Sequence, residues 1–452
     1  MPEPTSTPST TAANTDAAGG APHPLLADLS WRGALYQHTE GLSAFLSGRD
    51  DVRGYCGFDP TASSLHVGSL LPVMGLMRLQ QFGVRPVALV GGGTGMIGDP
   101  SGRASERTLI TADEVAANTA ALRTQLERFL DFGGPRAAEM RDNLSWLRPL
   151  GAIDFMRDVG KHFTVNYMLA KDSVKSRLEA GISFTEFSYM LLQAYDFLEL
   201  YRRDGVALQV GGSDQWGNMT AGMELIRRTV GGEAHVLTFP LLTKADGTKF
   251  GKSEGGNVWL DAELTSPYAF YQFWVNADDR DVGRLLRLFT LLPREEIETL
   301  DAATSARPEA REAQHALARD VTARVHGAEQ MRAAVEVSTL LFGGGDPRQL
   351  STAALALLRR EVRFTRLAPA VGLTDGNGAP ALADVLDLLT ATGLAASRGA
   401  AKRLVEQGGV YVNGERRSMG ERFVREEDLL RGRHVLLRKG ARDYALVEIA
   451  PA

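Results

Sequence analysis

The 452-residue sequence predicts an α/β protein with a parallel sheet, then a mainly helical part, then a small α+β part at the C-terminus. Strand-like and helix-like segments alternate from Leu25 to about Lys244, which favours a parallel sheet with helices on both faces. Residues 266–342 are mostly helical in pattern. Beyond residue 380, a basic helix-like segment precedes a strand-like run and the turn Asn413-Gly414. A chain of this length is expected to form roughly two to three domains.

The composition is that of a globular protein, with 44% hydrophobic and 23% charged residues. The formal charge is −5, so any RNA-binding surface must be local. The single cysteine, Cys56, excludes an intrachain disulfide and a Cys-rich zinc site, and it fits a reducing cytoplasm. Residues 1–24 lack a basic start and an apolar run, so we expect a disordered tail rather than a signal peptide or membrane anchor. No later stretch approaches the roughly 20 apolar residues of a membrane-spanning helix.

The first motif joins a strand, a polar turn and the start of a helix. The strand-like residues 55–58 run into the turn 59–65, and the step His66-Val67-Gly68-Ser69 follows. The N-terminus of a helix attracts anions through its free N–H groups and its dipole. The unit therefore predicts a nucleotide site, although a structural role for His66 is the simpler alternative.

The next elements are bounded by glycines and capping residues. Residues 87–90 form a buried-strand candidate that ends in three glycines. Thr111 and Glu114 form a capping box for a helix that we expect to end at Gly133. A second capping box at Ser183 and Glu186 opens a helix that runs to about Arg203, and the strand-like residues 208–210 follow.

This second helix carries Tyr189, Gln193 and Asp196 at positions i, i+4 and i+7. At 100° per residue the three side chains share one face. They could form a solvated stripe, but the apolar residues around them favour an enclosed polar pocket.

Residues 93–98 match the pattern G-x-G-x-x-G, which also occurs in dinucleotide-binding dehydrogenases. A single match is weak. Asp99-Pro100 interrupts the helix that this fingerprint should open, and no acidic residue closes a second strand about 20 residues further on.

A second polar motif lies at Lys249-Phe250-Gly251-Lys252-Ser253, where two lysines flank a Gly-containing turn. Exposed lysines in a solvated loop are the simpler interpretation, but paired ammonium groups in a mobile loop also suit a polyphosphate. Together with residues 55–69, the helix stripe and the string Gly211-Gly212-Ser213-Asp214-Gln215-Trp216-Gly217-Asn218, it resembles the bacterial tyrosyl-tRNA synthetases of the class I aminoacyl-tRNA synthetase family. The resemblance extends from about Leu25 to the C-terminus.

The resemblance implies a Rossmann-like nucleotide-binding domain, a helical domain and an S4-like RNA-binding domain. We expect the following divisions: a disordered tail at 1–24, a catalytic domain at 25–248 with a connective insertion at about 130–190, the lysine loop and helical anticodon-side domain at 249–345, a linker at 346–379 and the S4-like domain at 380–452.

The implied activity is that of a tyrosine-tRNA ligase in the cytoplasm, which activates tyrosine with ATP and Mg²⁺ and transfers it to tRNA(Tyr) for protein biosynthesis. A homodimer formed through the insertion is expected, without a metal site of its own, a tightly bound cofactor or a membrane partner. The closest alternative is a tryptophanyl-type class I enzyme, against which Asp196 and Tyr55 argue. A catalytically dead RNA-binding protein would be expected to have lost His66, Lys249 or Asp214.

The resemblance also assigns roles to individual residues. For tyrosine it implies Tyr55, Asp99, Tyr189, Gln193, Asp196 and Gln215. For ATP it implies Cys56, Gly57, Asp59, Gly68, Ser69, Arg103, Arg107, Gly212, Asp214 and Lys252. Catalytic roles fall to Thr61, His66, Lys249 and Lys252, and RNA binding to Arg398, Lys402 and Arg403. Ser69 departs from the family pattern, which has His or Asn at this position.

A buried phenol needs both an acceptor for its proton and a donor to its oxygen, and a carboxylate can only accept. Asp196 would supply the acceptor, and the resemblance assigns the donor to Tyr55.

Overall fold

The computed structural model describes residues 21–99, 110–171, 174–175, 178, 181–248, 250–253, 256–370, 372–375 and 378–450. The chain divides into two compact units, one within Met1–Trp259 and Asp278–Pro308, the other within Leu260–Ala277 and Glu309–Ala452. Most of the expected tail lies outside the described residues, and helix α1 already begins at Pro24.

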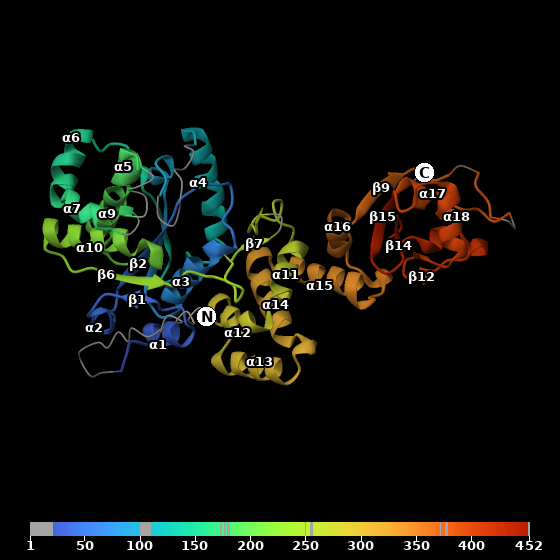
Figure 1. The fold of residues 1–452 in the computed structure, drawn as a ribbon, viewed down its shortest axis with the longest axis horizontal. Helices are drawn as coiled ribbons and strands as arrows, with labels where there is room; N and C mark the ends of the chain where they lie inside the picture. Colours follow the sequence, from blue (N-terminus) through green and yellow to red (C-terminus); the bar gives the residue numbers. More distant parts are fainter. Residues whose placement is uncertain are drawn as a thin grey trace, which may run out of the picture. The chain divides into compact units, whose positions relative to one another are not determined.

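A six-stranded sheet in the order β1-β6-β5-β2-β3-β4 forms the centre of the first unit (Figure 1). Only β1 is antiparallel to its neighbour, and all the other pairs are parallel. The predicted parallel sheet is therefore confirmed. Its strands are β1 (Gln37–His38), β2 (Arg53–Phe58), β3 (Arg85–Val90), β4 (Glu139–Asp142), β5 (Val206–Gly212) and β6 (His235–Phe239). A separate small hairpin pairs β7 (Lys252–Ser253) with β8 (Gly256–Asn257).

One hydrophobic core cluster of this unit lies between the sheet and two long helices, α9 (Phe184–Asp204) and α10 (Trp216–Val230), which pack against each other (Figure 1). Ser183 caps α9 by accepting a hydrogen bond from the Glu186 N–H group, and α9 ends close to the predicted residue. The other helices are α1 (Pro24–Trp31), α2 (Leu42–Ser47), α3 (Leu70–Gln81), α4 (Ala112–Leu126), α5 (Leu144–Leu147), α6 (Ala152–Asp154), α7 (Val165–Leu169), α12 (Asp279–Phe289) and α13 (Arg294–Ala306).

The capping box at Thr111 is present, because its hydroxyl accepts from the Glu114 N–H group while the Glu114 carboxylate accepts from the Thr111 N–H group. The helix that it opens ends at Leu126, earlier than the predicted Gly133. Phe129 is still buried, so the apolar pattern continues past the end of the helical backbone. The residues that follow α4 are turns, which explains why periodicity alone overestimated its length.

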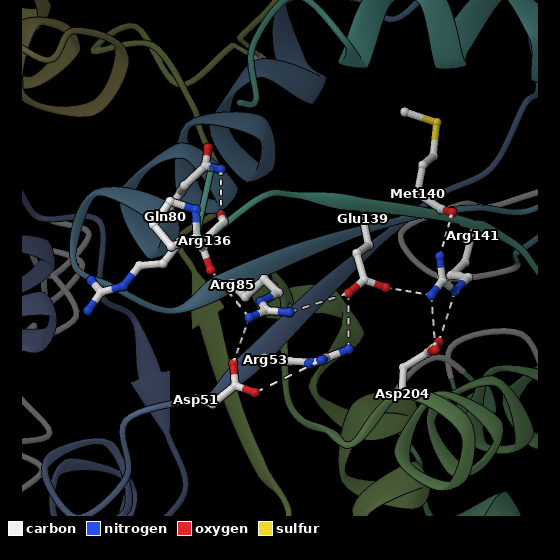
Figure 2. A network of polar contacts seen from close by, with 10 residues as sticks. Asp51, Arg53, Gln80, Arg85, Arg136, Glu139, Met140, Arg141 and Asp204 are labelled. Carbon is white, nitrogen blue, oxygen red and sulfur yellow. Dashed lines mark hydrogen bonds and ion pairs between the residues drawn. The ribbon is translucent and has the colours of Figure 1, made fainter. Parts of the chain in front are cut away.

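An ion-pair network joins the amino ends of three neighbouring strands (Figure 2). The carboxylate of Glu139 on β4 lies 3.0 Å from a guanidinium nitrogen of Arg53 on β2 and 3.9 Å from one of Arg85 on β3. Arg141 bridges the same carboxylate to Asp204 at the end of α9. The network thus fixes the edge of the sheet from which these strands run toward the pocket described below.

The second unit combines helices with a five-stranded sheet in the order β12-β11-β14-β15-β9. Its helices are α11 (Pro267–Val275), α14 (Glu312–His326), α15 (Ala328–Gly343), α16 (Thr352–Glu361), α17 (Val385–Ala391) and α18 (Arg398–Glu406). Its strands are β9 (Arg363–Leu367), β10 (Ala383–Asp384), β11 (Val410–Val412), β12 (Glu415–Arg416), β13 (Phe423–Val424), β14 (His434–Lys439) and β15 (Asp443–Ile449).

The second unit contains the predicted basic helix and strand, and it also contains regular structure in the stretch that was expected to be a linker. The predicted basic helix, strand and Asn-Gly turn correspond to α18, β11 and the connection from β11 to β12. The stretch 346–379, expected to be a linker, contains α16 and β9, and β9 pairs in parallel with β15. The C-terminal sheet therefore includes a strand from upstream of residue 380.

Among the described residues, no helix is both long enough and apolar enough to cross a membrane.

Candidate active site

A pocket of about 690 Å³ opens at the carboxyl edge of the parallel sheet in the first unit. The ends of β2, β3, β5 and β6 contribute to its walls, together with one face of α9. Open parallel sheets typically bind ligands at this edge. The pocket lining includes every residue that was predicted to contact tyrosine or ATP or to act in catalysis and whose side chain the structure describes: Tyr55, Cys56, Gly57, Asp59, Thr61, His66, Gly68, Ser69, Asp99, Tyr189, Gln193, Asp196, Gly212, Asp214 and Gln215.

Asp196 lies at the buried end of the α9 stripe, with 2% of its surface exposed. Asn143 Nδ2 donates to Asp196 Oδ2 at 2.9 Å, and the Trp146 indole N–H group donates to Oδ1 at 2.7 Å. Burial raises the pKa of this carboxyl to about 7, although the two donated hydrogen bonds act in the opposite direction. Each carboxylate oxygen has more than one acceptor site, so Asp196 can still accept a hydrogen bond from a ligand.

The Tyr55 hydroxyl is buried and has no hydrogen-bond partner among the described residues. Burial, together with the nearby charge of Asp196, holds the pKa of Tyr55 well above its usual value, so the hydroxyl keeps its proton. The ring packs at a tilt against Phe197, with 5.2 Å between the ring centroids. A buried hydroxyl without a partner is costly, so Tyr55 offers an open donor to a ligand.

Carboxylates gather around Tyr189 in another part of the pocket lining. The Tyr189 hydroxyl donates to Asp59 Oδ2 at 2.8 Å, and Gln215 Nε2 donates to Asp99 Oδ2 at 2.6 Å. Burial and the charges of Asp59 and Asp99 raise the pKa of Tyr189 well above its usual value. Two carboxylates beside neutral hydroxyl and amide groups make this part of the pocket suitable for a cationic group, such as an ammonium.

His66 caps the short 3₁₀ turn Val67–Ser69, because its Nδ1 accepts from the Gly68 N–H group at 3.0 Å. The neutral ring must therefore carry its proton on Nε2, which acts as the donor. A Cβ atom at residue 68 would lie 2.8 Å from His66 Cε1, so glycine is needed for this close approach. The His66 ring also meets Trp259 edge to face, with 6.1 Å between centroids.

Burial raises the pKa of the Cys56 thiol to about 12. This group therefore stays protonated and is a poor nucleophile.

The side chains of four predicted tyrosine, ATP or catalytic residues are not described, so they cannot be placed in the pocket. Lys249, Arg103 and Arg107 lie outside the described residues. The main chain of Lys252 belongs to β7, but its side chain is not among those described.

The three predicted RNA-binding cations lie on α18 in the second unit. Arg398 pairs with Asp384 at 2.8 Å and also with Asp387. Lys402 lies 3.8 Å from Glu406, whereas Arg403 is exposed. Arg398 and Lys402 are thus partly neutralised by carboxylates of the same unit.

Several residues in or next to the pocket were not predicted from the sequence. Asn143 and Trp146 hold Asp196, Thr94 donates to Asp59 at 2.7 Å, and the side-chain oxygen of Gln209 is buried without a partner among the described residues. Asn143 comes directly after β4, at the carboxyl edge where parallel strands place ligand-binding groups. That position could have identified Asn143 as a site residue. However, residues 139–142 lack the apolar pattern of a buried strand, so β4 was not recognised in the sequence.

The comparisons with known proteins agree with this fold. Residues 47–343 match the family model of class I tRNA synthetases (W and Y), and residues 374–447 match that of the tyrosine-tRNA ligase SYY-like C-terminal domain. The tyrosine-tRNA ligase of Anaeromyxobacter dehalogenans is 55% identical over 94% of this chain and 99% of its own. That of Bacillus caldotenax is 51% identical over 94% of this chain and all of its own length.

A solved structure is also similar. The C-terminally truncated mitochondrial tyrosyl-tRNA synthetase of Aspergillus nidulans has 31% sequence identity and a TM-score of 0.64, covering 70% of this chain and 94% of its own. The fold built on the parallel sheet is thus that of a class I tRNA synthetase. Within this class, the chain belongs to the tyrosyl-tRNA synthetase family.

Proposed function

We propose that the protein is a tyrosine-tRNA ligase. The tyrosine carboxylate attacks the α-phosphorus of ATP and displaces diphosphate, giving tyrosyl-adenylate. The terminal ribose hydroxyl of tRNA(Tyr) then attacks the activated carbonyl, and AMP leaves. One observation carries the choice of amino acid: the buried Tyr55 hydroxyl, without a partner among the described residues, lines the same pocket as the buried acceptor Asp196.

In this proposal the substrate phenol donates to Asp196 and accepts from Tyr55. Asn143 and Trp146 orient the carboxylate by donating one hydrogen bond to each of its oxygens. Phenylalanine would leave the buried Tyr55 hydroxyl without a partner and would deprive Asp196 of the hydrogen bond from the substrate, and both losses cost binding free energy. The indole of tryptophan has a donor and no acceptor, so it would leave the Tyr55 hydroxyl unpaired. This is the reason to prefer tyrosine over the tryptophanyl alternative.

The ammonium group of tyrosine is placed beside Tyr189, Gln193 and Asp99, where the neighbouring carboxylates favour a cation. Gln215, which donates to Asp99, lies close to the substrate carboxylate. This arrangement leaves the carboxylate free to face the α-phosphorus.

ATP is placed between the glycine turn at residue 212 and the turn after β2. Asp214 accepts from the ribose hydroxyls, and Cys56, Gly57, Asp59, Gly68 and Ser69 line the remaining part of the nucleotide site. Thr61 and His66 donate to the phosphates as negative charge moves toward the leaving diphosphate. Lys249 and Lys252, with Arg103 and Arg107, neutralise that charge, and Mg²⁺ enters with ATP as part of the substrate.

Positioning and charge stabilisation account for catalysis here, so the mechanism has no covalent enzyme intermediate. The protonated Cys56 thiol agrees with this view. The test is amino-acid-dependent exchange between ATP and diphosphate, measured with each of the twenty amino acids. Tyrosine should be the best substrate by a wide margin, and preference for another amino acid would overturn the proposal. We expect the reaction to take place in the cytoplasm, as the family resemblance implies.

A homodimer is proposed because exposed large apolar residues are concentrated in one stretch of the sequence, the insertion at about 130–190. Six of the eleven exposed large hydrophobic residues in the described part of the chain fall there: Phe132, Ile153, Met156, Val165, Leu178 and Phe184. Exposed apolar surface is a feature of protein interfaces, and a second copy of the chain is the partner that the family resemblance implies.

Phe184 is 76% exposed, so Phe184→Asp should not disturb the fold of one subunit but should place a charge in the dimer interface. We expect the apparent mass in sedimentation to fall to that of a monomer at micromolar concentration. Phe342→Asp, at a residue that is 63% exposed and outside the insertion, is the matched control and should leave the mass unchanged. Equal masses for the two variants would contradict this interface.

The C-terminal part is proposed to bind tRNA through α18. Lys402 and Arg403 are exposed, so replacing both by alanine should not affect folding. We expect weaker tRNA binding and a shallower salt dependence, by about 0.7 to 0.9 units of slope for each phosphate that is no longer neutralised. Exchange between ATP and diphosphate should be unchanged. Arg280→Ala, at a 66% exposed side chain of the other unit, controls for general loss of positive charge. Unaltered tRNA affinity and slope in the α18 variant would contradict the assignment.

A further inference from the structure

Residues 249–253, with the two lysines Lys249 and Lys252, are called the signature segment below. Helix α12 makes one contact just before this segment and one within it. At the start of the helix, Asp281 Oδ2 accepts from the Ala245 N–H group at 3.0 Å. At its end, the Phe289 ring stacks on Phe250, with 5.5 Å between centroids and 19° between ring planes. Phe250 is the residue that follows Lys249 in the signature, and α12 is far from it in the sequence.

Phe250 also lines the pocket, although only 9% of its surface is exposed. Its N–H group donates to the Leu242 carbonyl at 3.3 Å, and the next residue, Gly251, has a φ of +89°. A Cβ atom on Gly251 would lie 3.3 Å from the Gly68 nitrogen. The segment therefore runs close against the turn that carries His66, and a small shift of Phe250 would move it relative to the pocket.

The helix that carries Phe289 is itself held firmly. Arg78 is 1% exposed, pairs with Asp28 of α1 at 3.0 Å and donates to the Thr290 carbonyl at 2.6 Å. Arg32 pairs with the same carboxylate at 2.9 Å and donates to the Leu292 carbonyl at 3.0 Å. The carbonyls at the end of a helix lack partners within the helix, so these two arginines stabilise the end at which Phe289 lies. Phe289 is 1% exposed in this setting.

We propose that Phe289 is a positioning residue for the adenylate-forming step. Its ring holds Phe250 and thereby sets the distance from the signature segment to the phosphates of ATP. The inference rests on the proposed function, in which the signature lysines stabilise the leaving diphosphate. An ordinary core contact would also explain the stacking, but it would affect only stability.

The test compares Phe289→Leu with Phe45→Leu, a buried phenylalanine of the same unit that does not line the pocket. We expect Phe289→Leu to slow single-turnover adenylate formation by about 10- to 100-fold, since a displacement of about 1 Å at a reacting centre can cost 10²-fold. The dissociation constant of tyrosine should change less than about twofold, because the tyrosine groups are elsewhere in the pocket. Phe45→Leu should lower the thermal stability by a similar amount, but it should change neither the rate of adenylate formation nor the dissociation constant of tyrosine. Equal rates in the two variants would overturn the inference.

A double-mutant cycle with Lys252→Ala separates a positioning role from general damage. If Phe289 acts through the signature segment, Phe289→Leu should have little further effect once Lys252 is absent. Independent, multiplicative losses would overturn the inference. Phe250→Leu removes the same ring contact from the other side. It replaces Phe289→Leu in the test if that variant does not fold.

The experiments also distinguish a failure of the proposed ligase function from a failure of the proposed role of Phe289. Absence of tyrosine-dependent exchange in the unmodified protein would refute the proposed function. Normal exchange, with a slow Lys252→Ala variant but an unaffected Phe289→Leu variant, would refute only the role of Phe289.

Discussion

Replacing Asp196 by asparagine should weaken tyrosine binding by about 1.5 to 3 kcal/mol, the range for loss of a hydrogen bond to a charged group. The substitution keeps the shape of the side chain but exchanges an acceptor-only carboxylate for an amide that also donates. Discrimination against phenylalanine should narrow as well, because phenylalanine no longer leaves a buried carboxylate without its ligand. The measurement is the ratio of exchange efficiencies for tyrosine and phenylalanine in the two proteins. An unchanged ratio would mean that Asp196 does not recognise the hydroxyl.

The same residue predicts a pH dependence. With a pKa of about 7 in the ligand-free protein, Asp196 is mostly ionised at pH 8 and mostly protonated at pH 6. The ionised form is the better acceptor, so tyrosine should bind about tenfold more weakly at pH 6 than at pH 8, a factor of ten for each pH unit below the pKa. In Asp196→Asn this dependence should disappear. A flat profile in the unmodified protein would contradict the link between the carboxylate and the phenol.

Replacing His66 by alanine should slow adenylate formation on the order of 10²-fold, as expected for loss of one positioned donor to a developing negative charge. His66 can donate this hydrogen bond through Nε2, because its Nδ1 already accepts from the Gly68 N–H group and the proton of the neutral ring is therefore on Nε2. Tyrosine affinity should be nearly unchanged, since the interaction is proposed to form mainly in the transition state. Single-turnover kinetics and equilibrium binding measure the two quantities separately.

His162→Ala is the matched control for this substitution, because His162 lies in the insertion and does not line the pocket. It should leave the rate of adenylate formation unaltered. A defect of His66→Ala confined to tyrosine binding would contradict the phosphate role.

The positions of the site residues on α9 followed from the helical period alone. Tyr189, Gln193 and Asp196 are close in the sequence, so their common face depends only on local geometry, and all three line the pocket. The same holds for the residues at the end of β2, where one strand and one turn bring the group together. Local structure was sufficient for these positions in both cases, whereas the roles of the residues came from the family resemblance.

Asn143 and Trp146 could not be found in this way. They reach Asp196 from a segment about 50 residues earlier in the chain, through a pairing of β3 with β4 that no local pattern specifies. Strand β9 was missed for a related reason. Three of its five residues are polar or charged, as is common at the edge of a sheet, and such a strand resembles a solvated connection.

The place of β9 in the C-terminal sheet has a practical consequence for isolating the RNA-binding part of the chain. A fragment that begins at residue 374, where the match to the C-terminal family model starts, would lack Arg363–Leu367. The backbone N–H and C=O groups of β15 that now bond β9 would then face water along an exposed edge. Unpaired edges recruit strands from other molecules, so such a fragment should aggregate. A fragment that begins before Arg363 should remain monodisperse.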